Sequence, residues 1–203
     1  MTDKINEKQG VYIQGHIKIH DPESGEVIVD KRNAIHYENM SLSLAESLGN
    51  GGSGWIHEMA FGNGGTSVDP TGIITYLTPN STGANASLYN QTFKKVVDDR
   101  SVSNTDPVRN KIETRHVSGT NYTDILVTCL LDYGEPSGQD AIDNASNTEN
   151  LYVFDELGLV GYDPAGTGRL LTHVIFHPVQ KSLNRLIQID YTVRVQSLSG
   201  LTN

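Results

Sequence analysis

Hydrophobic and polar residues alternate along much of this chain, most clearly near its C-terminal end. Over residues 187–195, Ile, Ile, Tyr, Val and Val occupy every second position, with polar residues between them. A period of two is typical of a strand with one face in the core and the other in water. Two further strand-like segments, residues 152–163 and 169–181, come before it with short turns between. The pattern predicts three consecutive antiparallel strands.

The front of the chain shows the same pattern twice. Apolar residues alternate over residues 11–19 and again over residues 26–30, and the sequence DPESG between them has proline early and glycine late. Such a sequence is typical of a tight turn. We predict a β-hairpin whose second strand continues towards residue 39.

One short helix is expected over residues 41–49. Asn39 or Ser41 could cap its first turn, and Gly49 could end it. The spacing places these apolar residues on one side: Met40, Leu44 and Leu48.

The middle of the chain predicts more strands, divided by polar loops. In the strand over residues 55–61, Trp55, His57, Met59 and Phe61 share a face, which we expect to point into the core. Residues 66–90 are rich in Thr, Ser, Asn, Gly and Pro, and predict a long loop with one short strand or turn that contacts a neighbouring subunit. Strand-like segments then resume at residues 93–97, 110–117 and 124–131.

Eight to ten strands and one helix indicate a mainly β protein, an antiparallel β-sandwich of jelly-roll-like form. A chain of 203 residues fits one domain. We expect a single domain over residues 1–203, with an N-terminal arm (1–10) and extended loops near 62–90 and 134–150.

The net charge of -9 is concentrated in one segment. Residues 116–168 contain nine acidic residues and no lysine or arginine, while the other 15 acidic residues match the 15 basic ones. This distribution disfavours nucleic-acid binding, which needs a basic surface. The acidic segment could simply keep the surface soluble, or could dock a basic partner. The residues that we expect to contact a partner are Asp132, Glu135, Asp140, Asp143, Glu149 and the glycines Gly62, Gly64 and Gly65.

The residues that could carry chemistry do not form a catalytic, metal or cofactor pattern. His16 with His20, and His173 with His177, have four-residue spacing, but along a strand that spacing is about 13 Å, too far for one ion. Cys129 alternates with apolar residues and is expected to be buried. Neighbouring Asp155 and Glu156 should point to opposite faces of their strand. We therefore predict a protein that is not an enzyme and needs no cofactor.

Carbohydrate binding is an alternative of another class. Sandwich loops that carry Asn, Asp and aromatic side chains often bind sugars, and Tyr76, Tyr89 and Tyr122 lie in predicted loops or at strand ends.

Three phrases of the sequence resemble the N-terminal attachment domain of tailed-phage tail-collar fibre proteins and related baseplate proteins. The phrase WIHEMAFGNGG after a short helix, and then the phrase FDELGL with the strand after it, are similar to segments of the tail-collar proteins in the same order. The opening DPESGEVIVDKRNAIHYENM is also similar to openings of several phage baseplate and collar proteins. Residues 98–150 have no counterpart.

The resemblance implies a structural virion protein, made in the host cytoplasm. It would be an oligomeric adaptor that attaches fibres or joins collar and baseplate components; a capsid decoration or head-bound protein is the alternative. Its expected partners are further copies of itself and other virion proteins, with no nucleic acid and no membrane. Residues 1–10 have no apolar core, so we expect no signal peptide, and no apolar run reaches the roughly 20 residues of a membrane span.

Overall fold

The computed structural model describes residues 10–83, 86–137 and 151–198, and the protein is mainly β. Its strands and its single described helix follow one another in this order: β1 (Gly10–His20), β2 (Val27–Ile35), α1 (Tyr37–Leu48), β3 (Ile56–Gly62), β4 (Thr66–Val68), β5 (Ile74–Tyr76), β6 (Gln91–Val96), β7 (Lys111–His116), β8 (Tyr122–Leu131), β9 (Leu151–Gly161), β10 (Thr172–Ser182) and β11 (Ile187–Leu198).

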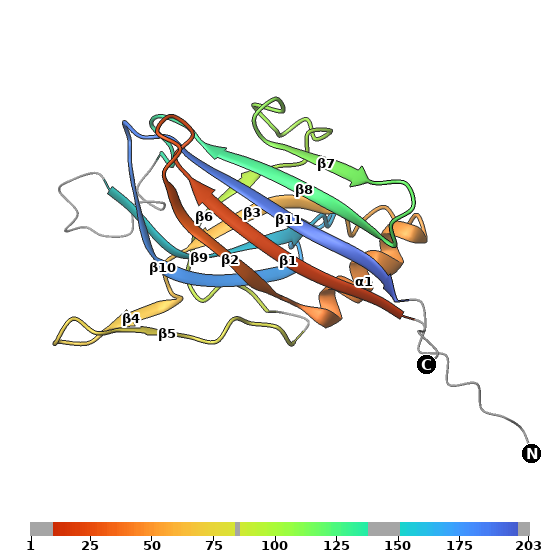
Figure 1. Cartoon of the computed structure of the whole chain (residues 1–203), viewed down its shortest axis with the longest axis horizontal. Helices are drawn as coiled ribbons and strands as arrows, with labels where there is room; N and C mark the ends of the chain where they lie inside the picture. The colour runs from red at the N-terminus through yellow and green to blue at the C-terminus, as the bar shows by residue number, and fades with distance from the viewer. Residues whose placement is uncertain (1–9, 84–85, 138–150, 199–203) are drawn as a thin grey trace, which may run out of the picture.

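Nine of the strands form one curled antiparallel sheet (Figure 1). The order across it is β6-β3-β9-β10-β2-β1-β11-β8-β7, so β6 and β7 are its two edges. β4 and β5 form a separate hairpin. Because the sheet curls, its two halves enclose a core in the manner of a β-sandwich, and the predicted fold class is confirmed.

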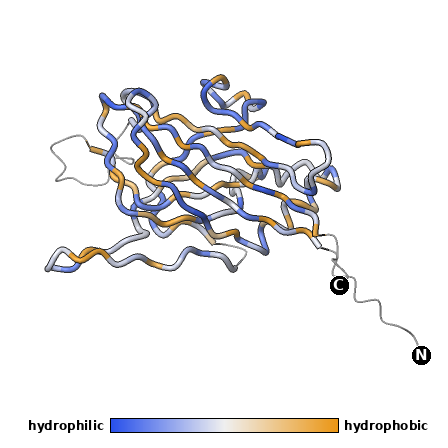
Figure 2. The backbone as a smooth tube through the Cα atoms, in the orientation of Figure 1, coloured by the Kyte–Doolittle hydropathy of each residue, from blue (hydrophilic) through white to orange (hydrophobic). Residues whose placement is uncertain are grey.

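The core follows from the alternation of the strands. Along β11, Ile187, Ile189, Tyr191 and Val193 are buried, as the period of two predicted. Figure 2 shows hydrophobic and hydrophilic residues alternating along the strands of the sheet. Phe154 of β9 lies among the core aromatic rings, with edge-to-face contacts to Phe61 and Phe176. Such contacts add to the free energy gained by burying the rings.

The helix begins four residues before the predicted segment. Its N-cap is His36, whose Nδ1 accepts a hydrogen bond of 3.2 Å from the Asn39 amide, so the prediction of Asn39 or Ser41 as the cap is wrong. Gly49 ends the helix as predicted. Met40 is buried, but Leu48, the last residue of the helix, is 87% exposed.

The two ends of the predicted domain are only partly described. Gly10, which we assigned to the N-terminal arm, is the first residue of β1. The loop near 134–150 is described as far as residue 137.

Replacing Phe154 by alanine should lower the free energy of unfolding by about 3–5 kcal/mol, because the change leaves a cavity among packed rings. Urea denaturation measures the change. Val108→Ala is the matched control, since Val108 is 79% exposed and should shift stability by less than about 0.5 kcal/mol. Equal effects of the two changes would contradict this description of the core.

Candidate functional site: an anchored hairpin and an open groove

Two buried acidic residues of β9 hold the loop that follows β3. Asp155 accepts hydrogen bonds of 2.9 Å from the amides of Gly65 and Thr66, and another from the Thr66 hydroxyl. Glu156 accepts one of 3.1 Å from the Gly64 amide. Since β4 starts at Thr66, these bonds fix the base of the β4–β5 hairpin.

Glu156 also holds the far end of the same excursion. It accepts hydrogen bonds from the backbone amides of Tyr89 (3.0 Å) and Asn90 (2.8 Å), just before β6. One carboxylate therefore joins the start and the end of the segment that connects β3 with β6. Charge-assisted bonds of this kind are stronger than those between neutral groups.

His173 of β10 extends this anchor. Its Nε2 lies 2.9 Å from Glu156, and its Nδ1 accepts a 2.8 Å hydrogen bond from the Asn80 amide. An acceptor at Nδ1 requires the proton of a neutral ring to be on Nε2, from which it is donated to Glu156. His173 and Glu156 are both fully buried, so this pair joins two parts of the fold and does not open to solvent.

The prediction that Asp155 and Glu156 point apart is wrong. Both side chains bind the loop at residues 64–66. The reason is a register irregularity between β9 and β10: Glu156 pairs with Ile175, and Phe154 with Val179, so extra residues of β10 lie opposite Asp155. A bulge of this kind redirects neighbouring side chains.

The two carboxyl groups are perturbed in opposite directions. Burial raises the pKa of Asp155, despite its hydrogen bonds from Thr66 and Gly65. Burial also opposes ionisation of Glu156, but the hydrogen bonds from His173 and the backbone amides of Asn90, Tyr89 and Gly64 outweigh it and lower the pKa of Glu156. Glu156 is thus held as a carboxylate by the donors that it gathers.

The glycines that we predicted to touch a partner are packed against their own chain. A Cβ atom on Gly62 would lie 2.4 Å from the Asn90 carbonyl oxygen, and one on Gly64 would lie 2.7 Å from the Asn90 nitrogen. At Gly65 a Cβ would approach Ile175 Cγ2 to 2.9 Å. Their small size allows the loop to lie directly on β9 and β10. Contact of these glycines with another subunit stays a prediction.

The β4–β5 hairpin projects from the body of the protein, at the end away from α1 (Figure 1). Hydrogen bonds between its own residues hold the turn: the Asp69 side chain accepts from the Thr71 hydroxyl (2.6 Å) and from the amides of Thr71 and Ile73. Gly72, at a φ of +87°, completes the turn. The hairpin nevertheless exposes Val68, Ile73 and Tyr76, which are 62%, 63% and 51% exposed.

An open groove of about 710 Å³ lies between α1 and the inner face of the sheet. Its floor is aliphatic and includes Leu44 of α1, Ile112 of β7 and Ile125 of β8. The loop that follows β6 forms its rim with Arg100 and Val102. The groove marks where the curled sheet, with its two edges β6 and β7, leaves part of its interior uncovered.

Trp55 lies in this groove and not in the core, so its predicted burial is wrong. The indole is 41% exposed, stacks on Tyr162 at 4.5 Å between ring centroids, and donates from Nε1 to Asp98 at 3.1 Å. His57 Nδ1 lies 3.4 Å from the same carboxylate. Met59 and Phe61, further along β3, are buried as predicted. Alternation identified the inner face correctly but could not show where the interior stays open.

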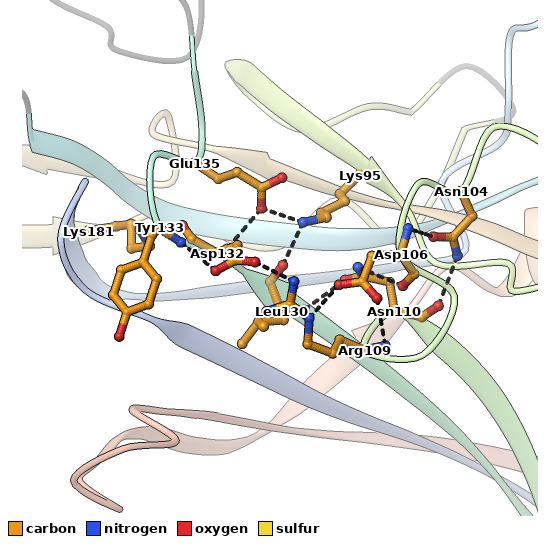
Figure 3. A network of polar contacts seen from close by, with 10 residues as sticks. All are labelled: Lys95, Asn104, Asp106, Arg109, Asn110, Leu130, Asp132, Tyr133, Glu135 and Lys181. Carbon is orange, nitrogen blue, oxygen red and sulfur yellow. Dashed lines mark hydrogen bonds and ion pairs between the residues drawn. The ribbon is translucent and has the colours of Figure 1, made fainter.

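The two described residues of the predicted acidic partner surface bind cations of their own chain (Figure 3). Asp132 pairs with Arg109, and Glu135 pairs with Lys95, whose Nζ also donates to the Leu130 carbonyl at 2.7 Å. Asp132 and Glu135 are thus largely neutralised within the molecule. Asp140, Asp143 and Glu149 lie outside the described residues.

The histidine pairs have separate partners. His16 contacts Asp30, and His20 contacts Asp190. His177, four residues after buried His173, is exposed and lies 3.3 Å from the Tyr76 hydroxyl. Within residues 10–83, 86–137 and 151–198, no group of three or more His, Cys, Asp or Glu side chains could hold a metal ion.

Cys129 is fully buried as predicted, and this burial raises the pKa of its thiol to about 12. Such a thiol is unreactive at neutral pH.

Comparison of the chain with protein-family models, with curated proteins and with solved structures finds no match. In the described part of the chain, no helix has the length and apolar character needed to cross a membrane.

Replacing Glu156 by glutamine should destabilise the protein by about 1–3 kcal/mol, because the amide brings its own donors towards backbone amides that need an acceptor. In this variant, hydrogen exchange at the amides of Gly64, Tyr89 and Asn90 should be faster than in the wild type, by a larger factor than exchange in β11. Glu113→Gln on the edge strand β7 is the control: it removes only partly exposed ion pairs with Lys111 and Arg115, so it should destabilise the protein less than Glu156→Gln and leave exchange at the three amides unchanged. Slow exchange at all three amides of the Glu156 variant would contradict the anchoring role.

Lys181 gives a pH-dependent prediction. Its side chain is buried and donates to the carbonyls of Asp132 and Ser182, and burial lowers the pKa of its ammonium group from 10.5 to about 8. Between these two pH values the unfolded chain binds more protons than the folded one, so the free energy of unfolding attributable to this group should rise with pH.

Urea denaturation at pH 7.5, 9 and 10.5 checks the Lys181 prediction. Lys181→Met should remove the rise that this group contributes, whereas Lys94→Met, at a half-exposed lysine, serves as the control. If the free energy of unfolding depends on pH in the same way in the wild type and in the Lys181 variant, the lowered pKa of Lys181 is wrong.

Proposed function

We propose that this protein is a structural component of a tailed-phage virion, a homo-oligomeric adaptor that joins fibre, collar or baseplate parts. The observation that carries the proposal is the β4–β5 hairpin, which projects from the sheet, exposes apolar side chains and is fixed at its base by buried Asp155 and Glu156. The sequence phrases that resemble tail-collar attachment domains support the virion context.

The physical state of the hairpin supports a role in assembly. A two-stranded hairpin alone is marginally stable in water, and this one leaves three large apolar side chains, Val68, Ile73 and Tyr76, uncovered. Contact with another subunit would bury them. Because the turn and the base are already fixed by hydrogen bonds, little conformational entropy is lost on docking.

Ion pairs within the chain weaken the acidic surface that a basic partner could contact. Asp132 and Glu135 already bind Arg109 and Lys95, which reduces the field that they offer to a basic partner. Docking of the acidic segment to a basic subunit therefore depends on its remaining acidic residues. Such docking would weaken as salt rises, whereas contacts of the hairpin would persist.

A carbohydrate-binding module is the second candidate, and the position of Trp55 favours it. An exposed indole beside an aromatic neighbour and a carboxylate is a common platform for sugar rings, and Trp55, Tyr162 and Asp98 form such a group. Glycan-array binding by the monomer, lost in Trp55→Ala, would support this candidate. The aliphatic floor of the same groove favours an apolar occupant over a sugar.

The proposed function predicts that the purified chain self-associates. Sedimentation velocity over a range of concentrations should show an oligomer, and Val68→Lys should weaken association at least about tenfold, the effect of losing one well-packed contact residue. Val108→Lys makes the same change at an exposed valine outside the hairpin and should associate like the wild type.

A chain that stays monomeric at all concentrations, with and without candidate virion partners, would contradict the proposed function. The genes that flank this one provide a separate check of the virion context, because neighbours that encode tail, neck or capsid proteins are expected.

A further inference from the structure

We propose that the open groove of one copy receives the β4–β5 hairpin tip of a second copy, which makes the subunit contact head-to-tail. This inference rests on the proposed function as an assembly protein. It adds the identity of both contact surfaces and their occupant, which is another copy of the same chain.

The groove and the tip match in chemistry. The groove floor offers aliphatic side chains from five elements, among them the partly exposed Leu44, Ile56, Ile112 and Ile125. The tip presents the aliphatic side chains of Val68 and Ile73 on a turn held rigid by Asp69. Inserting these side chains would remove apolar surface from water on both molecules. A volume of about 710 Å³ is within the range that proteins use to enclose a ligand.

The groove rim carries Arg100 together with two acidic residues, Asp98 and Asp99. Arg100 is exposed on the groove rim, and no carboxylate pairs with its guanidinium among the residues that the structure describes. The tip carries one charged residue, Asp69. Asp98, next to Arg100, is already bound by Trp55, His57 and the Arg100 amide, while Asp99 is exposed beside it. An Asp69–Arg100 contact would orient the incoming tip.

The fold makes this contact intermolecular. The hairpin and α1, which forms one wall of the groove, lie at opposite ends of the molecule, so the tip cannot reach the groove of its own chain (Figure 1). A contact between two different surfaces repeats from copy to copy and produces a closed ring or an open filament.

Two complementary variants test the proposal. Ile73→Lys spoils the tip but leaves the groove intact, and Val102→Lys spoils the groove rim but leaves the tip intact. Both residues are strongly exposed, at 63% and 103%, so neither change should disturb folding. Each variant alone should be monomeric at concentrations where the wild type associates. An equimolar mixture has one intact tip and one intact groove, and should form heterodimers that grow no further.

Several readouts separate the outcomes. Association of the wild type with no heterodimer in the mixture would overturn the hairpin-in-groove contact and leave the proposed function intact. A monomeric wild type would overturn both. Glycan binding in the groove that Val102→Lys abolishes, with unaltered association, would assign the groove to sugar and also overturn the contact. Val108→Lys should behave like the wild type throughout.

A separate variant tests whether the negative charge of Asp69 contributes to the contact. Asp69→Asn keeps an oxygen that can accept the turn hydrogen bonds but removes the negative charge. It should weaken association about two- to fivefold at low salt and make it less sensitive to salt. Unchanged affinity and unchanged salt dependence would remove Asp69 from the contact.

Discussion

The burial of two adjacent carboxylates beneath a glycine loop is the interaction on which the working part of this protein depends. Asp155 and Glu156 gather the backbone amides at both ends of the segment between β3 and β6, and His173 adds a third point of attachment. Without these acceptors, the buried amide of Gly65 and the partly buried amides bound beside it would lose their partners, at a cost that a short hairpin could not offset. The anchor converts a long polar connection into an arm with a defined direction.

The curl of the sheet creates the second surface that matters for assembly, the open groove. Nine antiparallel strands bring β3 and β7 towards one another without pairing them, and α1 covers only part of the interior that remains. The same fold thus produces an arm with uncovered apolar side chains at one end and an uncovered apolar floor at the other. An isolated copy leaves both exposed to water, which favours self-association.

Strand alternation predicted most of the sheet, including β1, β2 and the buried stripe of β11, because burial on one face leaves a direct mark on the sequence. The helix start was missed because its cap is the buried side chain of His36, a residue outside the usual capping set. The convergence of Asp155 and Glu156 depends on an irregular β9–β10 register that no local pattern shows. The hairpin tip could have been found: Asp69, Pro70 and Gly72 are ordinary turn residues between short apolar segments.

Hydrogen exchange of the β4–β5 amides, measured in the full chain below and above the concentration of self-association, tests the central claim most directly. The account predicts that exchange around Ile73 slows at least about tenfold in the associated state, while exchange around exposed Val108 stays the same. Association without any added protection of the hairpin would contradict the claim that this arm joins the subunits.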